Sequence, residues 1–261
     1  MTDDELAEVG LLLRVDGPVA TVTLNRPERR NAQTPAMWTA LARLGRELPG
    51  DVRVVVVTGA GPSFSAGLDL QMFTPEGIPG APSFLDLARS SDADADATIA
   101  AFQEAFTWLL RPDLLTVAAV RGHAVGAGFQ LALAADFRVC AADATFTMAE
   151  VTRGIVPDLG GTGLLTALVG YSRALEICVT GRRVGADEAV RIGLATVAVP
   201  DGELEAAVSD LVAALLAAPR DAAVETKALL LGARTRGLAE QRAAEREAQL
   251  RRLRDLAGIG E

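Results

Sequence analysis

Two short glycine-containing stretches mark places where the backbone itself could do chemistry. "FSAGLDL" (64–70) follows one apolar strand pattern, and "VGAGFQ" (125–130) follows another. Each predicts a tight turn from a strand into a helix N-terminus, where backbone N–H groups lack intrahelical partners. Two such turns on adjacent strands could aim N–H groups at one carbonyl oxygen, and the glycines would let a substrate approach closely. The spacing alone is equally compatible with glycines that only allow tight packing of α/β layers.

Other catalytic and cofactor sites are not indicated. The chain has one histidine, His123, and two cysteines, so no metal site is predicted. "DADADA" (92–97) has the initial aspartate spacing of a calcium loop, but it lacks the glycine, and Gln103 stands where the bidentate acid belongs. We therefore expect a solvated loop there. No G-x-S-x-G occurs, and Phe64 replaces the third glycine of a dinucleotide-binding loop.

The elements that would position the two turns alternate between strands and helices. Residues 11–24 are typical of a β-hairpin around Gly17-Pro18. Residues 34–48 predict a helix, with Thr34 as N-cap and Pro35 at the first helical position. The β-branched run at 52–61 ends in glycine and predicts a strand buried on both faces.

The same alternation continues through the middle of the chain. Residues 114–122 predict another strand, and a helix is expected from about residue 127. "DFRVCA" (136–141) and "ATFTMAE" (144–150) predict short strands. Together these elements indicate an α/β architecture. The segment 71–98 is rich in Pro, Gly, Ser and Asp, and we expect it to be mobile.

The end of the chain is almost purely helical from about residue 201. Its last helix is strongly charged and carries leucines at 250, 253 and 256, so it should pack on the body or on a partner subunit.

Composition narrows the function classes. A net charge of −9 argues against a nucleic-acid partner, although a phosphorylated ligand could still bind a few local arginines. No apolar run is long enough to span a membrane, and "MTDDELAEVG" (1–10) has no signal-peptide pattern. A reduced, cytoplasmic protein is the expectation.

Four motifs resemble those of the crotonase superfamily, the enoyl-CoA hydratase/isomerase family. They are "LNRPERRNA" (24–32), "VTGAGPSFSAGLDL" (57–70), "VRGHAVGAGFQLALAADFRVCAADATF" (120–146) and "GIVPDLGGT" (154–162), and "GRRVGADEAVRIGLATVAVP" (181–200) extends the likeness. The resemblance implies a spiral of ββα turns that binds acyl-CoA over residues 1–200. It also implies a helical oligomerisation segment at 201–261, and hence a homotrimer or a homohexamer.

The resemblance implies that two backbone N–H groups, those of Leu68 and Ala127, polarise the thioester carbonyl of an acyl-CoA. Each such donor stabilises the transition state by roughly 3 kcal/mol. Coenzyme A would be part of the substrate, with no separate cofactor. The expected substrate-binding residues are Ala66, Gly67, Leu68, Asp69, Leu70, Gly126 and Gln130. The candidates for contacts with the CoA phosphates, or else solvated turn residues, are Arg26, Arg29 and Arg30.

The acid/base positions decide the reaction. Family hydratases use two glutamates, and this chain has Gln130 at the first position and Glu150 at the second. An amide cannot accept or release a proton at neutral pH, so hydration by paired carboxylates is compromised. Gln130 could still orient water or the thioester, or it could simply bond to a neighbouring backbone group.

Isomerases of the family need less, because one carboxylate can move a proton from C2 to C4. Glu150 matches their base, with a surface carboxylate or a cap as the alternative. Asp158 matches the second acid of dienoyl-CoA isomerases, but it could instead be the N-cap of the next helix.

Three interpretations follow from the resemblance. The first is an enoyl-CoA isomerase with Glu150 as base and Asp158 as helper, and the second is a hydratase that uses Glu150 and a water held by Gln130. The third is an acyl-CoA-binding protein without turnover. Residues 71–110 are expected to shape the acyl pocket, with Phe102 and Trp108 as wall candidates, although a core position suits Trp108 better. Members of the family often carry a C-terminal lysine that reaches a neighbouring subunit's CoA phosphate. The segment "RRLRDLAGIGE" (251–261) contains no lysine, so this contact is not expected from it.

Overall fold

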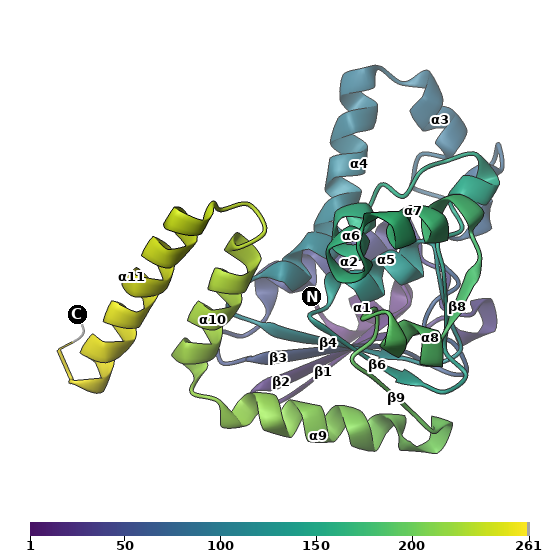
Figure 1. Ribbon diagram of the computed structural model, residues 1–261. Coiled ribbons are helices and arrows are strands. Elements are labelled where there is room, and N and C mark those ends of the chain that lie inside the picture. Colours follow the sequence, from purple (N-terminus) through teal and green to yellow (C-terminus); the bar gives the residue numbers. More distant parts are fainter. Residues whose placement is uncertain (260–261) are drawn as a thin grey trace.

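Six strands form the main sheet of the computed structural model, which describes residues 1–259 (Figure 1). Their order in the sheet is β1-β2-β3-β4-β6-β9, and only the β1–β2 hairpin is antiparallel. The strands are β1 (Leu11–Asp16), β2 (Val19–Leu24), β3 (Val54–Gly59), β4 (Leu115–Val120), β6 (Phe137–Ala141) and β9 (Val197–Val199). The predicted hairpin and the predicted strands are confirmed.

Strand β3 is buried on both faces, as its unbroken run of valines predicted. Val55 and Val57 face a large core beneath the helices, whereas Val54 and Val56 face a second, smaller cluster. Helix α9 (Leu204–Ala217) closes that second cluster with Leu204, Val208 and Val212. Figure 1 shows α9 running across the face of the sheet opposite the other helices.

A second, three-stranded sheet lies beside the first and has the order β5-β7-β8. Its strands are β5 (His123–Val125), β7 (Thr145–Thr147) and β8 (Arg183–Gly185). Strand β4 is therefore followed by β5 and then by helix α5 (Ala127–Ala134), while β6 is followed by β7. This repetition of one strand in each sheet is the spiral of ββα turns that the family resemblance implied.

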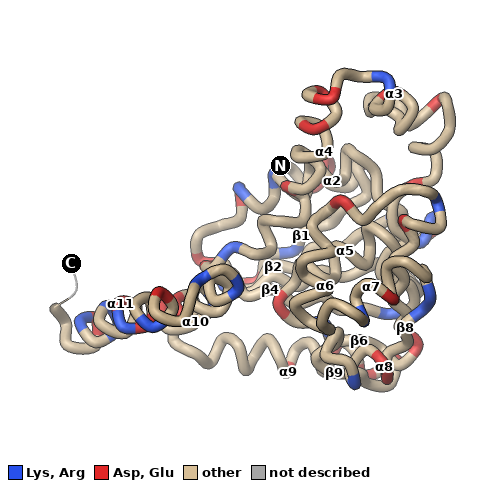
Figure 2. Tube along the Cα trace, turned by 45° about the horizontal axis from the view of Figure 1, so that its top comes forward, with Lys and Arg blue, Asp and Glu red and all other residues tan. Residues whose placement is uncertain are grey.

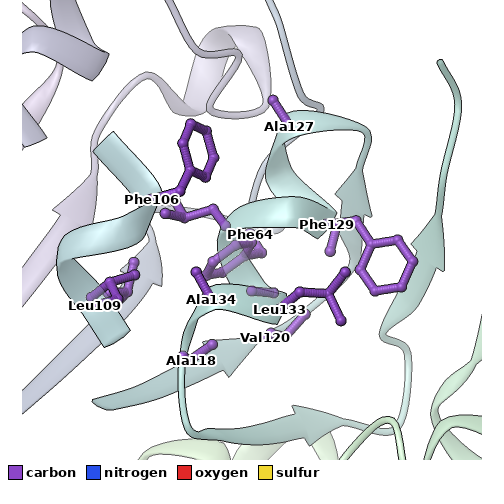
Figure 3. Close-up of a cluster of buried hydrophobic side chains, with 14 of the residues drawn as sticks. Phe64, Phe106, Leu109, Ala118, Val120, Ala127, Phe129, Leu133 and Ala134 are labelled. Atoms are coloured by element: carbon purple, nitrogen blue, oxygen red, sulfur yellow. The ribbon is translucent and has the colours of Figure 1, made fainter. Parts of the chain in front are cut away.

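The helices around the large core begin where the sequence predicted. Helix α2 (Pro35–Glu47) starts after Thr34, whose hydroxyl accepts a hydrogen bond from the N–H of Met37. Helix α5 is buried along its whole length. Figure 3 shows its side chains Ala127, Phe129, Leu133 and Ala134 in the cluster that also contains Phe64 and Phe106. Because α5 has no exposed face, its N-terminus is held rigidly against the sheet.

One expectation for the segment 71–98, that of a solvated loop, is wrong. "DADADA" (92–97) is not a solvated loop but the first turns of helix α4 (Asp92–Thr107). Ser91 accepts a hydrogen bond from the N–H of Asp94, and Asp92 and Asp94 interact favourably with the positive helix end. Capping chemistry therefore decides the structure of this acidic stretch. The preceding elements are η2 (Leu70–Phe73) and α3 (Phe84–Arg89).

Helices α10 (Arg220–Gly232) and α11 (Leu238–Leu256) form a hairpin that projects from the body (Figure 1). Figure 2 shows charges of both signs distributed along α11. Leu250, Leu253 and Leu256 are exposed, by 52, 50 and 86 %. Their role in subunit contacts stays a prediction, as does the boundary between a core of 1–200 and an oligomerisation segment of 201–261.

The remaining helices are short or lie at the edges of the sheets. They are α1 (Asp3–Glu8), η1 (Pro27–Arg29), η3 (Trp108–Leu110), η4 (Val151–Arg153), α6 (Gly161–Val169), α7 (Tyr171–Thr180), α8 (Ala186–Arg191) and η5 (Asp201–Glu203). Within residues 1–259, none of the helices combines the length and the apolar character needed to cross a lipid bilayer.

Candidate active site

A cavity of about 320 Å³ lies where the two glycine turns meet helices α3 and α4. It brings together most of the residues expected at the site, although they come from four separate stretches of the sequence. The expected residues that line it are Ala66, Gly67, Leu68, Leu70, Gly126, Ala127, Gln130, Glu150 and Asp158. Of the expected substrate-binding residues, only Asp69 is missing from its walls.

The two turns touch one another through Gly67. Its backbone has a φ of +85°, and a Cβ at this position would lie 2.4 Å from the carbonyl oxygen of Val125 and 3.4 Å from the nitrogen of Ala127. Hydrogen bonds on the far side of the chain, from Gln33 N–H to the Gly67 carbonyl and from Asp69 N–H to the Gln33 carbonyl, fix the first turn. Only glycine allows the turns to approach this closely.

The N–H groups of Leu68 and Ala127 are available to a ligand. Ala127 is the first residue of α5, so its N–H has no partner within the helix. Among residues 1–259, no carbonyl or side-chain oxygen accepts a hydrogen bond from either group. Two unpaired donors on turns in contact are suited to stabilise one developing oxyanion.

The carboxyl group of Glu150 lies against the second turn. Its Oε1 is 3.2 Å from the position that a Cβ on Gly126 would occupy, and Gly126 itself has a φ of +50°. Glu150 is only 7 % exposed, and this burial raises the pKa of its carboxyl group. The backbone N–H of Glu150 itself and then the hydrogen bond from Gln130 oppose that rise, whereas the negative charge of Asp158 adds to it. Glu150 is therefore not a surface carboxylate, and although it stands at the N-cap position of η4 (Val151–Arg153), its side chain makes no capping hydrogen bond.

The amide group of Gln130 forms hydrogen bonds through both its nitrogen and its oxygen. Its Nε2 donates to Oε1 of Glu150 over 2.7 Å, and its own Oε1 accepts from the N–H groups of Leu159 and Gly161 over 3.0 and 3.2 Å. The backbone bonds are those expected for a helix amide. The bond to Glu150 was missed by the sequence analysis, because it joins residues that only the tertiary fold brings together.

Asp158 lines the same cavity, and burial raises the pKa of its carboxyl group. The alternative that Asp158 caps the next helix is wrong. Helix α6 begins after Gly160, which has a left-handed conformation, and no side chain caps it. The carbonyl of Asp158 accepts a hydrogen bond from Nε2 of Gln103 on α4 over 2.6 Å. Its carboxylate is thus free of the capping role.

The rest of the cavity is apolar. Phe102 lines it as expected, and its ring lies 4.9 Å from that of Trp38, a wall residue that the sequence analysis missed. The indole N–H of Trp38 donates to Gln33, the residue that anchors the first glycine turn. Trp108 packs in the core against Gly45, not in the cavity wall. Further apolar lining comes from Phe84, Leu87, Ala88, Ala95 and Ile99.

Asp69 makes structural contacts, and its expected contact with the substrate stays a prediction. It accepts from the N–H of Gln71 at the start of η2, and Nη1 of Arg26 donates to it over 3.0 Å. Arg26 is thereby committed to a half-buried ion pair. Arg29 and Arg30 are exposed and lie outside the cavity walls, so their contact with CoA phosphates stays a prediction. The arginine that does line the cavity is Arg153, whose guanidinium lies 5.7 Å from the centre of the Phe73 ring.

Comparison with a family model matches residues 14–253 to "Enoyl-CoA hydratase/isomerase". A "putative enoyl-CoA hydratase" from Thermobifida fusca YX, solved in complex with CoA, is 52 % identical with a TM-score of 0.94, over 99 % of this chain and 98 % of that one. The same protein has also been solved in complex with acetoacetyl-CoA.

The names of two curated relatives refer to different reactions. The human mitochondrial Delta(3,5)-Delta(2,4)-dienoyl-CoA isomerase is 35 % identical, over 85 % of this chain and 68 % of its own length. The "Probable enoyl-CoA hydratase EchA12" of Mycobacterium tuberculosis is 40 % identical over 71 % of this chain. The match spans 64 % of that relative, which is less than two thirds of its length.

Proposed function

The chain belongs to the enoyl-CoA hydratase/isomerase family, and on that premise we propose that it moves the double bond of an unsaturated acyl-CoA thioester. Coenzyme A enters as part of the substrate, and no separate cofactor takes part. The acyl chain occupies the apolar cavity between α3 and α4, and its thioester end lies at the glycine turns. The structures of the Thermobifida fusca protein with CoA and with acetoacetyl-CoA support an acyl-CoA substrate.

The first step polarises the thioester. The N–H groups of Leu68 and Ala127 donate hydrogen bonds to its carbonyl oxygen. These hydrogen bonds become stronger as negative charge develops on that oxygen. The resulting enolate is stabilised by donors that need no rearrangement. We attribute roughly 3 kcal/mol of transition-state stabilisation to each donor.

Glu150 then carries the proton. Its carboxylate takes a proton from C2 of a 3-enoyl-CoA, and the electron pair of that bond enters the enolate. The same carboxyl group returns the proton to C4, which leaves the double bond between C2 and C3. A buried carboxyl group with a raised pKa suits both halves of this transfer, because it gives up a proton almost as readily as it takes one. Asp158, which lines the same cavity, assists as a second acid.

The observation that carries this proposal is the state of Gln130. Its oxygen already accepts two backbone hydrogen bonds, so it has little capacity left to accept from a catalytic water. An amide also cannot exchange a proton at neutral pH. Glu150, whose carboxylate is in direct contact with this amide, is therefore the group that transfers the proton. Isomerisation requires no more than one such carboxylate.

Hydration of a 2-enoyl-CoA is the second candidate, because relatives named as hydratases match the chain. In that reaction Glu150 would act with a water bound to the remaining N–H of Gln130. An acyl-CoA-binding protein without turnover is the third.

The test supplies 3-enoyl-CoA and 2-enoyl-CoA to the protein and to Glu150→Gln, and follows each substrate optically. We expect isomerisation of the 3-enoyl-CoA and a loss of at least about 1000-fold in kcat/KM in the variant. Glu104→Gln, the same change at an exposed position on α4, is the matched control and keeps full activity. Hydration that persists in Glu150→Gln, or tight binding with no turnover, would contradict the proposal.

A further inference from the structure

The orientation of the Gln130 amide is determined by its neighbours. Leu159 and Gly161 both present N–H groups to one end of it, and an N–H can only donate. The amide oxygen must therefore face these two groups. The amide nitrogen consequently faces Glu150, and the reverse orientation would oppose donors to donors.

This orientation makes the two oxygens of the Glu150 carboxyl group unequal. Oε1 accepts the Gln130 hydrogen bond over 2.7 Å. Oε2 is buried and has no hydrogen-bond partner among residues 1–259. The oxygen that accepts a hydrogen bond is the one that stays unprotonated, because a carboxylic acid accepts better through its carbonyl oxygen than through its hydroxyl.

We infer that Gln130 is a positioning residue that reserves Oε2 of Glu150 as the single oxygen that takes up and returns the substrate proton. This inference rests on the proposed isomerisation. The C2–H bond breaks, its proton moves to Oε2, and its electron pair forms the thioester enolate. The Oε2–H bond then breaks as the C4–H bond forms, while Gln130 neither gains nor loses a proton.

The same geometry explains why a glutamate at position 130 would change the chemistry. Its carboxylate could still accept from Leu159 and Gly161, but its other oxygen would face Oε1 of Glu150 without a hydrogen between them. Two carboxylates this close cannot both be ionised at neutral pH, and because two backbone N–H groups stabilise the anion at position 130, the proton stays on Glu150. Gln130→Glu therefore keeps the backbone bonds and reverses the effect on Glu150.

Other charged groups also act on Glu150 and must be separated from Gln130. Asp158, from the loop before α6, opposes its ionisation. Burial raises the pKa of the Cys178 thiol on α7 and the negative charge of Glu150 adds to that rise, while Arg153 of η4 lines the same cavity. The titration of Glu150 and the pH dependence of kcat/KM are therefore also measured with Asp158→Asn present in each protein.

The direct test titrates Glu150 without any substrate. Protein labelled with ¹³C at the glutamate carboxyl is followed by NMR across the pH range, and Glu150→Gln identifies the signal. In Gln130→Met we expect the pKa of Glu150 to rise by about one to two units, because a hydrogen bond to the charged form is lost. Gln103→Met removes a hydrogen bond to the Asp158 loop instead and should leave this pKa unchanged. An unchanged pKa in Gln130→Met, or an equal rise in Gln103→Met, would overturn the inference.

The kinetic test follows kcat/KM for a 3-enoyl-CoA against pH. The base must be ionised, so kcat/KM rises with pH through the pKa of Glu150. In Gln130→Met the rise should move to higher pH by the amount found by titration. A lowered plateau with no displacement would indicate only structural damage and would contradict a positioning role. Gln130→Glu, which keeps both backbone bonds, should show a displacement at least as large, and its absence would also contradict that role. If the native protein isomerises no substrate while the titration behaves as expected, the proposed function fails and the effect of Gln130 on Glu150 stands.

Discussion

Gly67 shows at the scale of one residue how the site depends on an absent side chain. Its φ of +85° is a conformation that L side chains rarely adopt, and its contact with the Val125 carbonyl leaves no room for a Cβ. The contact fixes the distance between the N–H groups of Leu68 and Ala127. Gly67 thus contributes no chemical group to the reaction and still determines where two donors lie.

Gly67→Ala should separate the two turns. We expect kcat/KM to fall by about 100-fold or more, since one donor would leave the carbonyl oxygen. Gly17→Ala is the matched control, because Gly17 also has a positive φ, of +52°, but nothing lies within 4 Å of its missing Cβ. The control should lower the free energy of unfolding by about 1 kcal/mol and leave kcat/KM unchanged. Equal losses of activity in both variants would show that backbone strain alone is responsible.

At the scale of one element, helix α4 has different roles at its two ends. Toward its C-terminal end it packs on α2, where Phe106 and Trp38 lie in edge contact. Toward its N-terminus, Ala95 and Ile99 line the cavity, while Ala93 and Ala97 are exposed. The helix is therefore anchored at one end and forms the acyl wall at the other. The contact of Phe73 with Phe84, 4.6 Å between ring centres, joins η2 to α3 in the wall of the same cavity.

Ala95→Phe should shorten the cavity. We expect the ratio of kcat/KM for a long-chain 3-enoyl-CoA to that for a short-chain one to fall by about tenfold or more, because the added ring occupies space that the end of the long chain needs. Ala97→Phe, an identical change on the exposed face of the same helix, should leave the ratio unchanged. The acyl chain does not lie along α4 if both variants give the native ratio.

At the scale of the whole molecule, one buried ion pair fastens the C-terminal helices to the body. Nζ of Lys227 on α10 donates to Asp136 over 2.8 Å and to the carbonyls of Leu109 and Leu114. Asp136 also accepts from Thr116 at the start of β4. A cavity of about 560 Å³, lined largely by leucine and alanine, surrounds this pair but contains none of the residues of the proposed mechanism. This ion pair therefore ties the charged α10–α11 hairpin to the body of the molecule.

Lys227→Met should leave the Asp136 carboxylate buried without its cation. We expect the free energy of unfolding in urea to fall by about 3 kcal/mol, and proteolysis between α9 and α10 to become faster. The double variant Lys227→Met, Asp136→Asn should recover part of the loss, because it buries no unpaired charge. A double variant no more stable than Lys227→Met would mean that the ion pair is not the source of the effect.

The sequence by itself determined the features that depend on neighbouring residues. The hairpin at 11–24, the capped helix after Thr34, the valine strand and the two glycine turns all follow from local backbone and capping preferences. The family motifs added the residues of the site, and most of them line the cavity, although Asp69 and the three arginines of 26–30 do not. The acidic run at 92–97 was predicted as a loop, but the Ser91 hydroxyl accepts a hydrogen bond from the N–H of Asp94 and starts a helix there.

Only the tertiary structure decided which of these residues touch. Gln130 and Glu150 are 20 positions apart in the sequence, and their hydrogen bond exists because α5 and the turn before η4 meet at one end of the cavity. The pairing of Asp69 with Arg26 and the place of Trp38 in the wall have the same origin. Contacts between distant segments depend on how strands and helices pack together, and no local pattern in the sequence encodes that packing.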